Sequence, residues 1–220
     1  MMTALEREQI NLRHMENGVW MMDPATTYID DTVEIGADTV LYPGCILEGA
    51  CVIGRGAVIG PYSHLKDTVV GDKSTVRNSV TDGAKIGANT DVGPFAYLRP
   101  EAVVGDGCRI GNFVEIKKAT LGDGSKMAHL AYIGDADVGK NVNISCGVIT
   151  ANYDGKKKHR TVIADDAFIG CNSNLVAPVE VGKGAYVAAG STINKDLPEY
   201  CLGIARERQT VKEDWARDKQ

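Results

Sequence analysis

Three residues in the middle of the chain have types and a spacing suited to chemistry. Arg99 and Lys117 are cations eighteen residues apart, and His129 follows them. A guanidinium fork and an ammonium group suit phosphate oxygens, and an imidazole can accept a proton near neutral pH. The three residues predict phosphate binding and a proton-accepting base. Taken alone, they are also consistent with two solvated cations and an ordinary surface histidine.

The elements that must position these residues are the short strands of a six-residue repeat. Between Ile29 and Leu197 an aliphatic residue returns every six positions, usually followed by Gly or another small residue. This period fits short parallel strands joined by tight turns, and neither a helix nor a long strand. The first residue of each hexad is expected to point inward, and the fifth is small. The pattern predicts an all-β hexapeptide-repeat solenoid.

Stacking of coils brings the candidate cations together. Three hexads close one coil, so residues 29–197 hold about nine coils spaced about 4.8 Å apart. Because eighteen residues make one coil, we expect Arg99 and Lys117 at the same corner of adjacent coils. Two stacked cations repel each other unless an anion binds between them, and phosphate is the ligand that we expect there. We expect His129 at an outward or corner position.

The repeat is interrupted in three places. A hexad is shortened at 65–70 and again at 76–80, which predicts two tolerated turn deletions. The large interruption is the polar segment 152–160, which we expect to leave the solenoid as a loop. Long loops on rigid scaffolds often carry function.

Both ends of the chain depart from the repeat. Residues 1–18 are interpreted as a capping helix over Thr3 to Asn17, with Thr3 and Glu6 at capping-box spacing and Gly18 as its stop. The repeat region is 19–197, and 198–220 is a charged arm, helical around Trp215, that forms a second cap or contacts a partner. The helix is expected to cover the open end of the solenoid through its apolar residues Leu5, Ile10, Leu12 and Met15.

Composition and cysteine use exclude several classes of protein. The net charge is −5 and no apolar run is long enough for a membrane helix, so neither nucleic acid nor a membrane is an expected partner. The start of the chain is charged where a signal peptide would be apolar, so we expect a cytoplasmic protein. Six cysteines occur without a CxxC pair. Cys45, Cys51 and Cys108 fall at fifth positions, which predicts buried thiols and no need for a disulfide.

Histidine placement argues against a metal site. Only His64 and His129 of the four histidines lie inside the coils, too few for a three-histidine zinc centre. We therefore expect no metal. His14 and His64 are interpreted as ordinary surface histidines.

An ordered set of motifs identifies a family resemblance. The motifs are Gly93–Pro100, Gly111–Lys118, His129–Ala136, Asn141–Ile144 and Asn152–Gly155. Together they resemble the carboxy-terminal half of the bifunctional bacterial glucosamine-1-phosphate N-acetyltransferases / N-acetylglucosamine-1-phosphate uridyltransferases. The resemblance covers nearly the whole chain.

The resemblance implies a left-handed parallel β-helix that forms a homotrimer, with active sites between subunits. It implies acetyl transfer from the co-substrate acetyl-CoA to the 2-amino group of glucosamine 1-phosphate, in UDP-N-acetylglucosamine biosynthesis, with no other cofactor. His129 matches the general base. The sugar-phosphate positions are Arg99, Lys117, Tyr132 and Asn143; the acetyl-CoA positions are Cys146, Asn152, Tyr153, Cys171, Ala189 and Arg206; and Lys158 is a further basic candidate.

Two residues depart from the family pattern, in which Ala and Ser are usual where this chain has Cys146 and Cys171. The departure is tolerable if a backbone N–H near Ser145 and Cys146 stabilises the oxyanion. A nucleophilic Cys146 is an alternative that the reaction does not need. The Gly-rich nucleotide loop of a uridyltransferase does not occur in the sequence, so we expect no synthesis of the nucleotide sugar from UTP.

Three other functions stay open at this point. One is acyl transfer to a different sugar, and another is a trimeric scaffold without catalysis. The third is a zinc enzyme resembling carbonic anhydrase, which predicts stoichiometric zinc.

Overall fold

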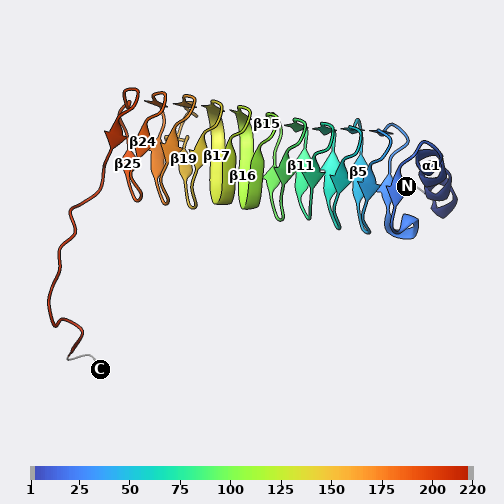
Figure 1. The fold of residues 1–220 in the computed structure, drawn as a ribbon, viewed down its shortest axis with the longest axis horizontal. Coiled ribbons are helices and arrows are strands. Elements are labelled where there is room, and N and C mark those ends of the chain that lie inside the picture. The colour runs from blue at the N-terminus through green and yellow to red at the C-terminus, as the bar shows by residue number, and fades with distance from the viewer. Residues whose placement is uncertain (1–2, 218–220) are drawn as a thin grey trace.

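The chain forms a long prism of short strands with a helix at one end and an extended arm at the other (Figure 1). The computed structural model describes residues 3–217. Strands of successive coils pair in parallel, as in Ile29 with Leu47 and Leu175 with Ile193. The predicted all-β parallel β-helix is confirmed.

The strands form three walls. Strands β16 (Arg109–Leu121) and β17 (Lys126–Val138) run through all three walls. The other strands of wall 1 are β1 (Trp20–Met21), β4 (Val40–Leu41), β7 (Val58–Ile59), β10 (Thr75–Val76), β13 (Asp91–Val92), β18 (Asn143–Ile144), β21 (Phe168–Ile169), β24 (Tyr186–Val187) and β26 (Leu202–Gly203). Those of wall 2 are β2 (Tyr28–Ile29), β5 (Ile46–Glu48), β8 (His64–Lys66), β11 (Val80–Asp82), β14 (Tyr97–Leu98), β19 (Ile149–Ala151), β22 (Asn174–Val176) and β25 (Thr192–Ile193). Those of wall 3 are β3 (Glu34–Ile35), β6 (Val52–Ile53), β9 (Val69–Val70), β12 (Lys85–Ile86), β15 (Val103–Val104), β20 (Thr161–Ile163) and β23 (Val179–Val181).

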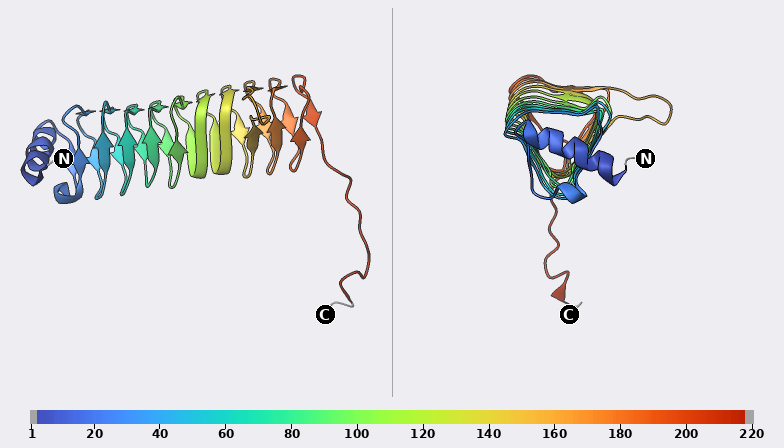
Figure 2. Two further views of the ribbon diagram at one scale, coloured as in Figure 1. Left: turned by 180° about the vertical axis from the view of Figure 1, so that it is seen from behind. Right: turned by 90° about the vertical axis from the view of Figure 1, so that its right-hand side faces the viewer.

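The coil winds in the left-handed sense. In the right-hand view of Figure 2 the N-terminal helix is nearest the reader and the solenoid recedes behind it. The arm leaves the bottom corner after wall 1, and the loop 152–160 leaves the upper right corner after wall 2. The chain therefore runs counterclockwise as it recedes, which confirms the handedness expected from the resemblance.

The hexad rule accounts for the core. First-position residues such as Leu47 and Ile59 are fully buried, and so are fifth-position residues such as Ala57. A coil therefore presents an aliphatic ladder and a row of small residues to its neighbours. Burial of each large side chain contributes on the order of 2 kcal/mol.

Shortened turns shift the register between coils. Leu47 pairs with Leu65 eighteen residues on, but Ile53 pairs with Val70 after seventeen and Leu65 with Thr81 after sixteen. The two predicted slips are confirmed. Three further slips were missed. Two of them, at 116–121 and 133–138, lie within the continuous strands β16 and β17, and the third is at 193–197, where Val181 pairs with Leu197 after sixteen residues.

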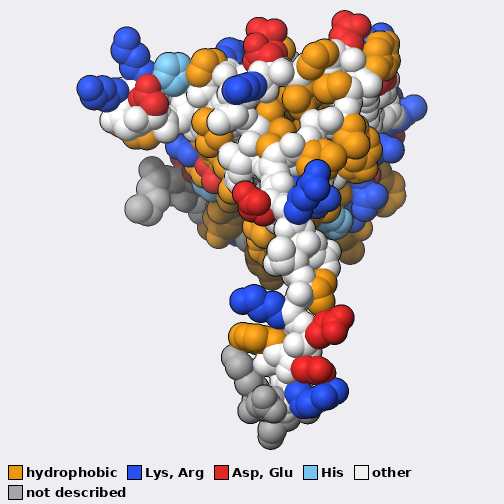
Figure 3. Space-filling view, turned by 90° about the vertical axis from the view of Figure 1, so that its left-hand side faces the viewer, with side chains coloured by type: hydrophobic (Ala, Val, Ile, Leu, Met, Phe, Trp, Pro, Cys, Tyr) orange, Lys and Arg blue, Asp and Glu red, His pale blue; other side chains and the backbone are white. Residues whose placement is uncertain are grey.

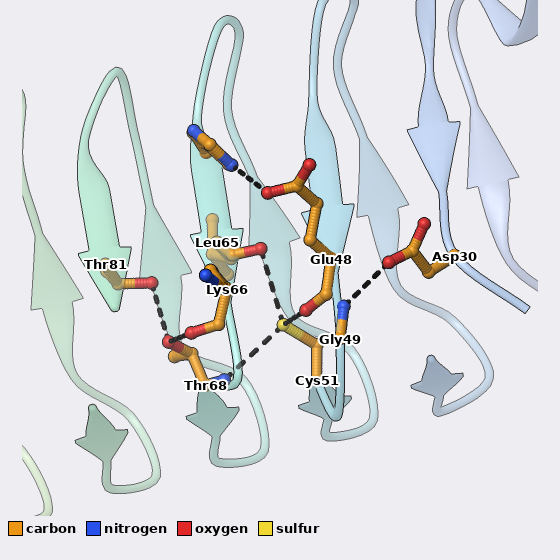
Figure 4. A network of polar contacts seen from close by, with 9 residues as sticks. Asp30, Glu48, Gly49, Cys51, Leu65, Lys66, Thr68 and Thr81 are labelled. Atoms are coloured by element: carbon orange, nitrogen blue, oxygen red, sulfur yellow. Dashed lines mark hydrogen bonds and ion pairs between the residues drawn. The ribbon is translucent and has the colours of Figure 1, made fainter. Parts of the chain in front are cut away.

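The fifth-position cysteines are confirmed as buried thiols. Figure 4 shows the Cys51 sulfur between its own coil and the next, where it contacts the Glu48 carbonyl at 3.1 Å and the Leu65 carbonyl at 3.5 Å. Cys45 and Cys108 are also buried. These thiols fill space and satisfy neighbouring carbonyls.

Helix α1 (Ala4–Glu16) lies across the N-terminal end of the prism, as expected (Figure 2). The Thr3 hydroxyl accepts from the Glu6 amide at 3.2 Å, and the Glu6 carboxylate accepts from the Thr3 amide at 2.7 Å. The predicted apolar face is only partly correct, because Leu5 and Leu12 are exposed.

The residues that α1 buries are polar. Asn11 donates to the Pro24 carbonyl at 2.9 Å, in the 3₁₀ turn η1 (Pro24–Thr26), and to the Thr27 carbonyl at 3.1 Å. His14 is also buried, which corrects its interpretation as a surface histidine. The helix docks on the end of the coil through hydrogen bonds as well as apolar contact.

The C-terminal boundary at 197 is wrong by one strand. Leu202 and Gly203 of β26 pair with Tyr186 and Val187, so the solenoid continues past Pro198. The arm then extends away from the prism and does not cover its end (Figure 1). Around Trp215 the described residues form turns in place of the expected helix.

Replacement of an inward aliphatic residue tests this packing. We expect Ile59→Ala to lower the free energy of unfolding by about 2–5 kcal/mol, because Ile59 is fully buried. Val69→Ala, on an exposed wall position, is the matched control and is expected to cost well under half as much. Urea unfolding followed by circular dichroism measures both, and equal losses would contradict the core assignment.

Candidate active site

Two corners of the prism collect the candidate residues. The first corner joins wall 1 to wall 2, and the second corner joins wall 2 to wall 3. Tyr132 lies on wall 2 between them, and Asn143 lies on wall 1 just before the first corner. The first corner carries His129, Cys146, Cys171 and Ala189, followed by Arg206; the second carries Arg99, Lys117 and Asn152, with Tyr153 and Lys158 on the loop.

The predicted stacking of Arg99 and Lys117 is confirmed. Leu98 pairs with Ile116, and the Arg99 amide donates to the Ile116 carbonyl at 2.8 Å. The two cations therefore follow paired residues at the second corner of adjacent coils. The Arg99 guanidinium also donates to Glu115 at 2.8 Å, a partner that sequence reasoning missed although Glu115 lies in a quoted motif.

Lys158 brings a third positive charge to the second corner. Its side chain reaches back from the loop to Lys117, and the hydrogen-bond contact between the two amino groups lowers the pKa of Lys117 and raises that of Lys158. Arg99 acts on Lys117 in the same direction. Three cations that repel one another around one point form a binding site for an anion such as phosphate.

Polar groups border this cation cluster. The buried Asn152 donates to Asp135 at 2.5 Å and lies 3.5 Å from the Tyr132 hydroxyl. A Cβ at Gly134 would lie 2.3 Å from the same hydroxyl, so only glycine allows Tyr132 to take this position. Asp135 was not among the predicted residues, and its carboxylate orients Asn152.

The loop 152–160 leaves the second corner as a short hairpin, as expected (Figure 2). Tyr153 and Lys158 form an antiparallel bridge, and the Tyr153 hydroxyl donates to the Gly155 carbonyl at 2.7 Å. The pKa of Asp154 is lowered to about 2 by the Lys157 amide, by the His159 ring at 2.7 Å and by the Lys156 amide, all of which contact its carboxylate. The space-filling view shows the loop tip with its basic side chains projecting from the prism (Figure 3).

The first corner carries the candidate base. His129 pairs with Asn112 of the previous coil and is exposed, which agrees with the expected outward position. A Cβ at Gly111 would lie 1.8 Å from the Ala128 carbonyl oxygen, so glycine is required where the two coils approach. The imidazole is available to a bound molecule.

Most of the acetyl-CoA candidates continue the His129 column. The Gly147 amide donates to the Leu130 carbonyl at 2.7 Å, which places Cys146 in the coil after His129. The Asn172 amide donates a hydrogen bond to the Cys146 carbonyl at 2.8 Å, which places Cys171 next to Cys146. The Gly190 amide donates to the Cys171 carbonyl at 2.8 Å, which places Ala189 next to Cys171. Arg206 then donates to the Ala189 carbonyl at 2.7 Å. This first-corner column runs toward the C-terminal end of the prism.

The two groups are separate within one chain. Gly134, which pairs with Lys117, comes five positions after His129 in β17, and five residue steps of strand span roughly 16 Å. The imidazole therefore does not lie beside the cation pair inside a single chain. Asn143 donates to the Ser145 hydroxyl at 3.1 Å and belongs with the first corner.

Neither a metal cluster nor a membrane span is found in the described part of the chain. Among residues 3–217, no three His, Cys, Asp or Glu side chains are grouped so that they could hold a metal ion. Within the same residues, no helix combines the length and hydropathy needed to cross a membrane.

Comparison with known proteins agrees with this geometry. The family model "Bacterial transferase hexapeptide (six repeats)" matches residues 32–67, 83–118 and 160–195. A solved structure, the Arabidopsis UDP-N-acetylglucosamine acyltransferase, aligns with a TM-score of 0.67 over 88% of this chain and 75% of its own, at 19% identity, which shows the shared fold. The chain belongs to the bacterial transferase hexapeptide family.

Similarity to curated proteins identifies a narrower group within this family. The chain is 59% identical over 209 residues to the "Bifunctional protein GlmU" of Geobacillus sp. (strain WCH70), covering 95% of this chain and 46% of that protein. It is 57% identical to the protein of the same name from Acetivibrio thermocellus, again over 95% of this chain and 45% of that protein. The chain thus spans about half the length of these relatives.

Removal of Lys158 tests the cation cluster. We expect Lys158→Ala to raise the pKa of Lys117 toward the ordinary lysine value of about 10.4, because the neighbouring ammonium that lowers it is lost. A side-chain carbon NMR titration of labelled lysines measures the shift. Lys118→Ala is the control, since Lys118 pairs with Glu101 at 3.2 Å; the same Lys117 titration in both variants would contradict the cluster.

Proposed function

We propose that this chain transfers the acetyl group of acetyl-CoA to the 2-amino group of glucosamine 1-phosphate, giving N-acetylglucosamine 1-phosphate and CoA in UDP-N-acetylglucosamine biosynthesis. The observation that carries the proposal is the column in which exposed His129 is followed, coil by coil, by Cys146, Cys171 and Ala189. A linear donor such as acetyl-CoA fits a column, with its thioester at the histidine. The extensive identity to proteins named GlmU supports the same reaction.

The second corner is the proposed acceptor site. Arg99, Lys117 and Lys158 bind the phosphate of the sugar, with the guanidinium held in place by Glu115. Tyr132 flanks the same point and offers a hydrogen bond to the sugar. The buried Asn152, which the resemblance places among the acetyl-CoA positions, lies 3.5 Å from the Tyr132 hydroxyl, so we assign it to the acceptor side instead. Phosphate binding offsets the repulsion among the three cations, which favours a phosphorylated acceptor over a neutral sugar.

The reaction needs both corners at one place, so we propose that it occurs between copies of the chain. In a homotrimer with its threefold axis along the prism, the first corner of one copy faces the second corner of the next. The roughly 16 Å between the corners of one chain supports this arrangement, because the bond-forming atoms must approach within about 3–3.5 Å. The arm beyond Gly203, which does not cover its own prism, is a further candidate for contact with a partner copy.

The chemical step follows from the residues present. His129 takes a proton as the sugar amine attacks the thioester carbonyl, since an ammonium group has no lone pair to attack with. The tetrahedral intermediate carries a negative oxygen, which a backbone N–H can stabilise. Its collapse breaks the C–S bond and releases the CoA thiolate, which takes up the proton held by His129. The Ser145 amide donates to the Ile169 carbonyl at 3.0 Å, so the Cys146 amide is the proposed donor.

A histidine substitution tests the base. We expect His129→Ala to remain folded and to lower acetyl transfer at least about a hundredfold, measured by thiol release from acetyl-CoA with glucosamine 1-phosphate. His64→Ala is the matched control, because His64 is bonded to Glu48 on another coil and should keep near wild-type turnover. Comparable turnover in both variants would favour another base or a non-catalytic scaffold.

An acceptor panel tests the phosphate site. We expect Arg99→Ala to raise the KM for glucosamine 1-phosphate about tenfold or more and to reduce the preference over glucosamine, because the guanidinium fork is lost. Arg55→Ala removes a surface arginine paired with Asp38 and serves as the control. An unchanged preference in Arg99→Ala, or faster transfer to a different sugar by the wild-type protein, would count against this acceptor.

A further inference from the structure

Three of the six free cysteines are not fully buried, and two of these three, Cys146 and Cys171, share the first corner. Cys45, Cys51 and Cys108 are buried, and burial raises the pKa of their thiols, to about 11 for Cys45. Because the thiolate is the reactive form, these three are protected from oxidation. Cys146 is half-buried and Cys171 is exposed, both at the first corner.

Cys146 and Cys171 occupy identical places in adjacent coils. Ile144 pairs with Ile169, and the Asn172 amide donates to the Cys146 carbonyl at 2.8 Å. Each cysteine is the third residue of its hexad. The residues that follow them, Gly147 with φ 76° and Asn172 with φ 54°, share the left-handed turn conformation. The two side chains therefore leave the backbone at equivalent points of stacked turns.

This stacking brings the backbones of the two cysteines to a spacing that a disulfide can bridge. The Cα separation of in-register residues in adjacent coils is about 4.8 Å, inside the roughly 4.4–6.8 Å range of disulfides. Their Cβ atoms, which point the same way, must move about 1 Å closer to reach the usual separation of about 3.8 Å. A bond formed under such strain at an exposed corner is reducible rather than permanent.

We propose that Cys146 and Cys171 form a reversible disulfide on exposure to a hydroperoxide, and that this bond closes the first-corner column to acetyl-CoA. One thiolate attacks the peroxide oxygen and becomes a sulfenic acid, releasing water or an alcohol from the reduced O–O bond. The second thiolate then attacks the sulfenic sulfur and expels water. The two thiols lose two electrons, and the peroxide gains them.

The effect on function rests on the proposed acetyl-CoA column. The hydrogen bond from the Gly147 amide to the Leu130 carbonyl places Cys146 one coil from His129. The disulfide therefore forms beside the proposed position of the thioester. The bond draws two stacked turns together and moves the Cys146 amide, which is the proposed oxyanion donor. A chain oxidised in this way loses donor binding while its core stays intact.

Peptide mapping and binding measurements test the two parts separately. Trypsin cleaves after Lys140, Lys156, Arg160 and Lys183, so the cysteines fall in different peptides, 141–156 and 161–183. After treatment of the native protein with hydrogen peroxide, we expect the two peptides to be joined and to separate on addition of dithiothreitol. On a non-reducing gel the oxidised protein should run as a single chain, which shows that the disulfide is intramolecular. Calorimetry is expected to show a Kd for acetyl-CoA raised at least about tenfold and restored by dithiothreitol.

Variants assign the effect to this pair. In Cys146→Ser and Cys171→Ser, each compared with its own untreated sample, peroxide should give no joined peptide and no reversible change in Kd. Cys201→Ser removes the other half-buried thiol and should behave like the wild type.

Each contrary result has a distinct meaning. Oxidation of both thiols without the joined peptide overturns the disulfide, and a joined peptide with unchanged acetyl-CoA affinity overturns the closure of the column. An untreated protein that binds no acetyl-CoA contradicts the proposed function, whereas the peptide map still decides whether the pair forms.

Discussion

The hydrogen bonds that hold each coil in register over the next are the interaction on which every functional feature depends. They run from an amide in one coil to a carbonyl in the adjacent coil, as from Arg99 to Ile116 and from Asn172 to Cys146. A residue at a corner therefore lies beside the residue at the same corner one coil away. The candidate functional residues therefore form columns, because residues far apart in sequence become neighbours along the axis of the prism.

The register also explains where the site departs from the ideal repeat. Between β16 and β17 the offset is seventeen residues, as in Ile116 with Ile133, and across the loop it rises to twenty-five, as in Ala136 with Thr161. The short coils and the inserted loop meet at the second corner. There, Asn152 at the base of the loop reaches Asp135 of the preceding coil, and Lys158 returns to Lys117. The irregular hexads thus form the polar part of the site on an otherwise regular scaffold.

Much of this could be predicted from sequence because the hexad pattern is a packing rule. It predicted the inward ladder, the buried Cys45 and Cys51, and the alignment of Arg99 with Lys117. Capping chemistry predicted α1, since it needs only Thr3 and Glu6. Side-chain partners such as Glu115 and Asp135 carry no periodic signal and were missed.

The errors have physical causes of the same kind. Leu12 was assigned to the buried face of α1 on hydropathy, whereas Asn11 and His14 take that place, because the helix docks on backbone carbonyls at the end of the coil. The last strand was missed because Leu202 follows a turn of irregular length, and pairing with Tyr186 restores the register. Local sequence reports which residues are apolar, and the tertiary partner decides which of them are covered.

The central claim is that the first corner of one copy and the second corner of another together make one site. The most direct measurement mixes two impaired chains, His129→Ala and Lys117→Ala, during co-expression, and assays acetyl transfer by the assembled protein at a glucosamine 1-phosphate concentration far below the KM of Lys117→Ala. At equal mixing in a trimer, one interface in four joins an intact His129 to an intact Lys117, so the account predicts recovery to about a quarter of wild-type activity. Mixed assemblies no more active than either variant alone would show that both residues must come from the same chain, and would contradict the account.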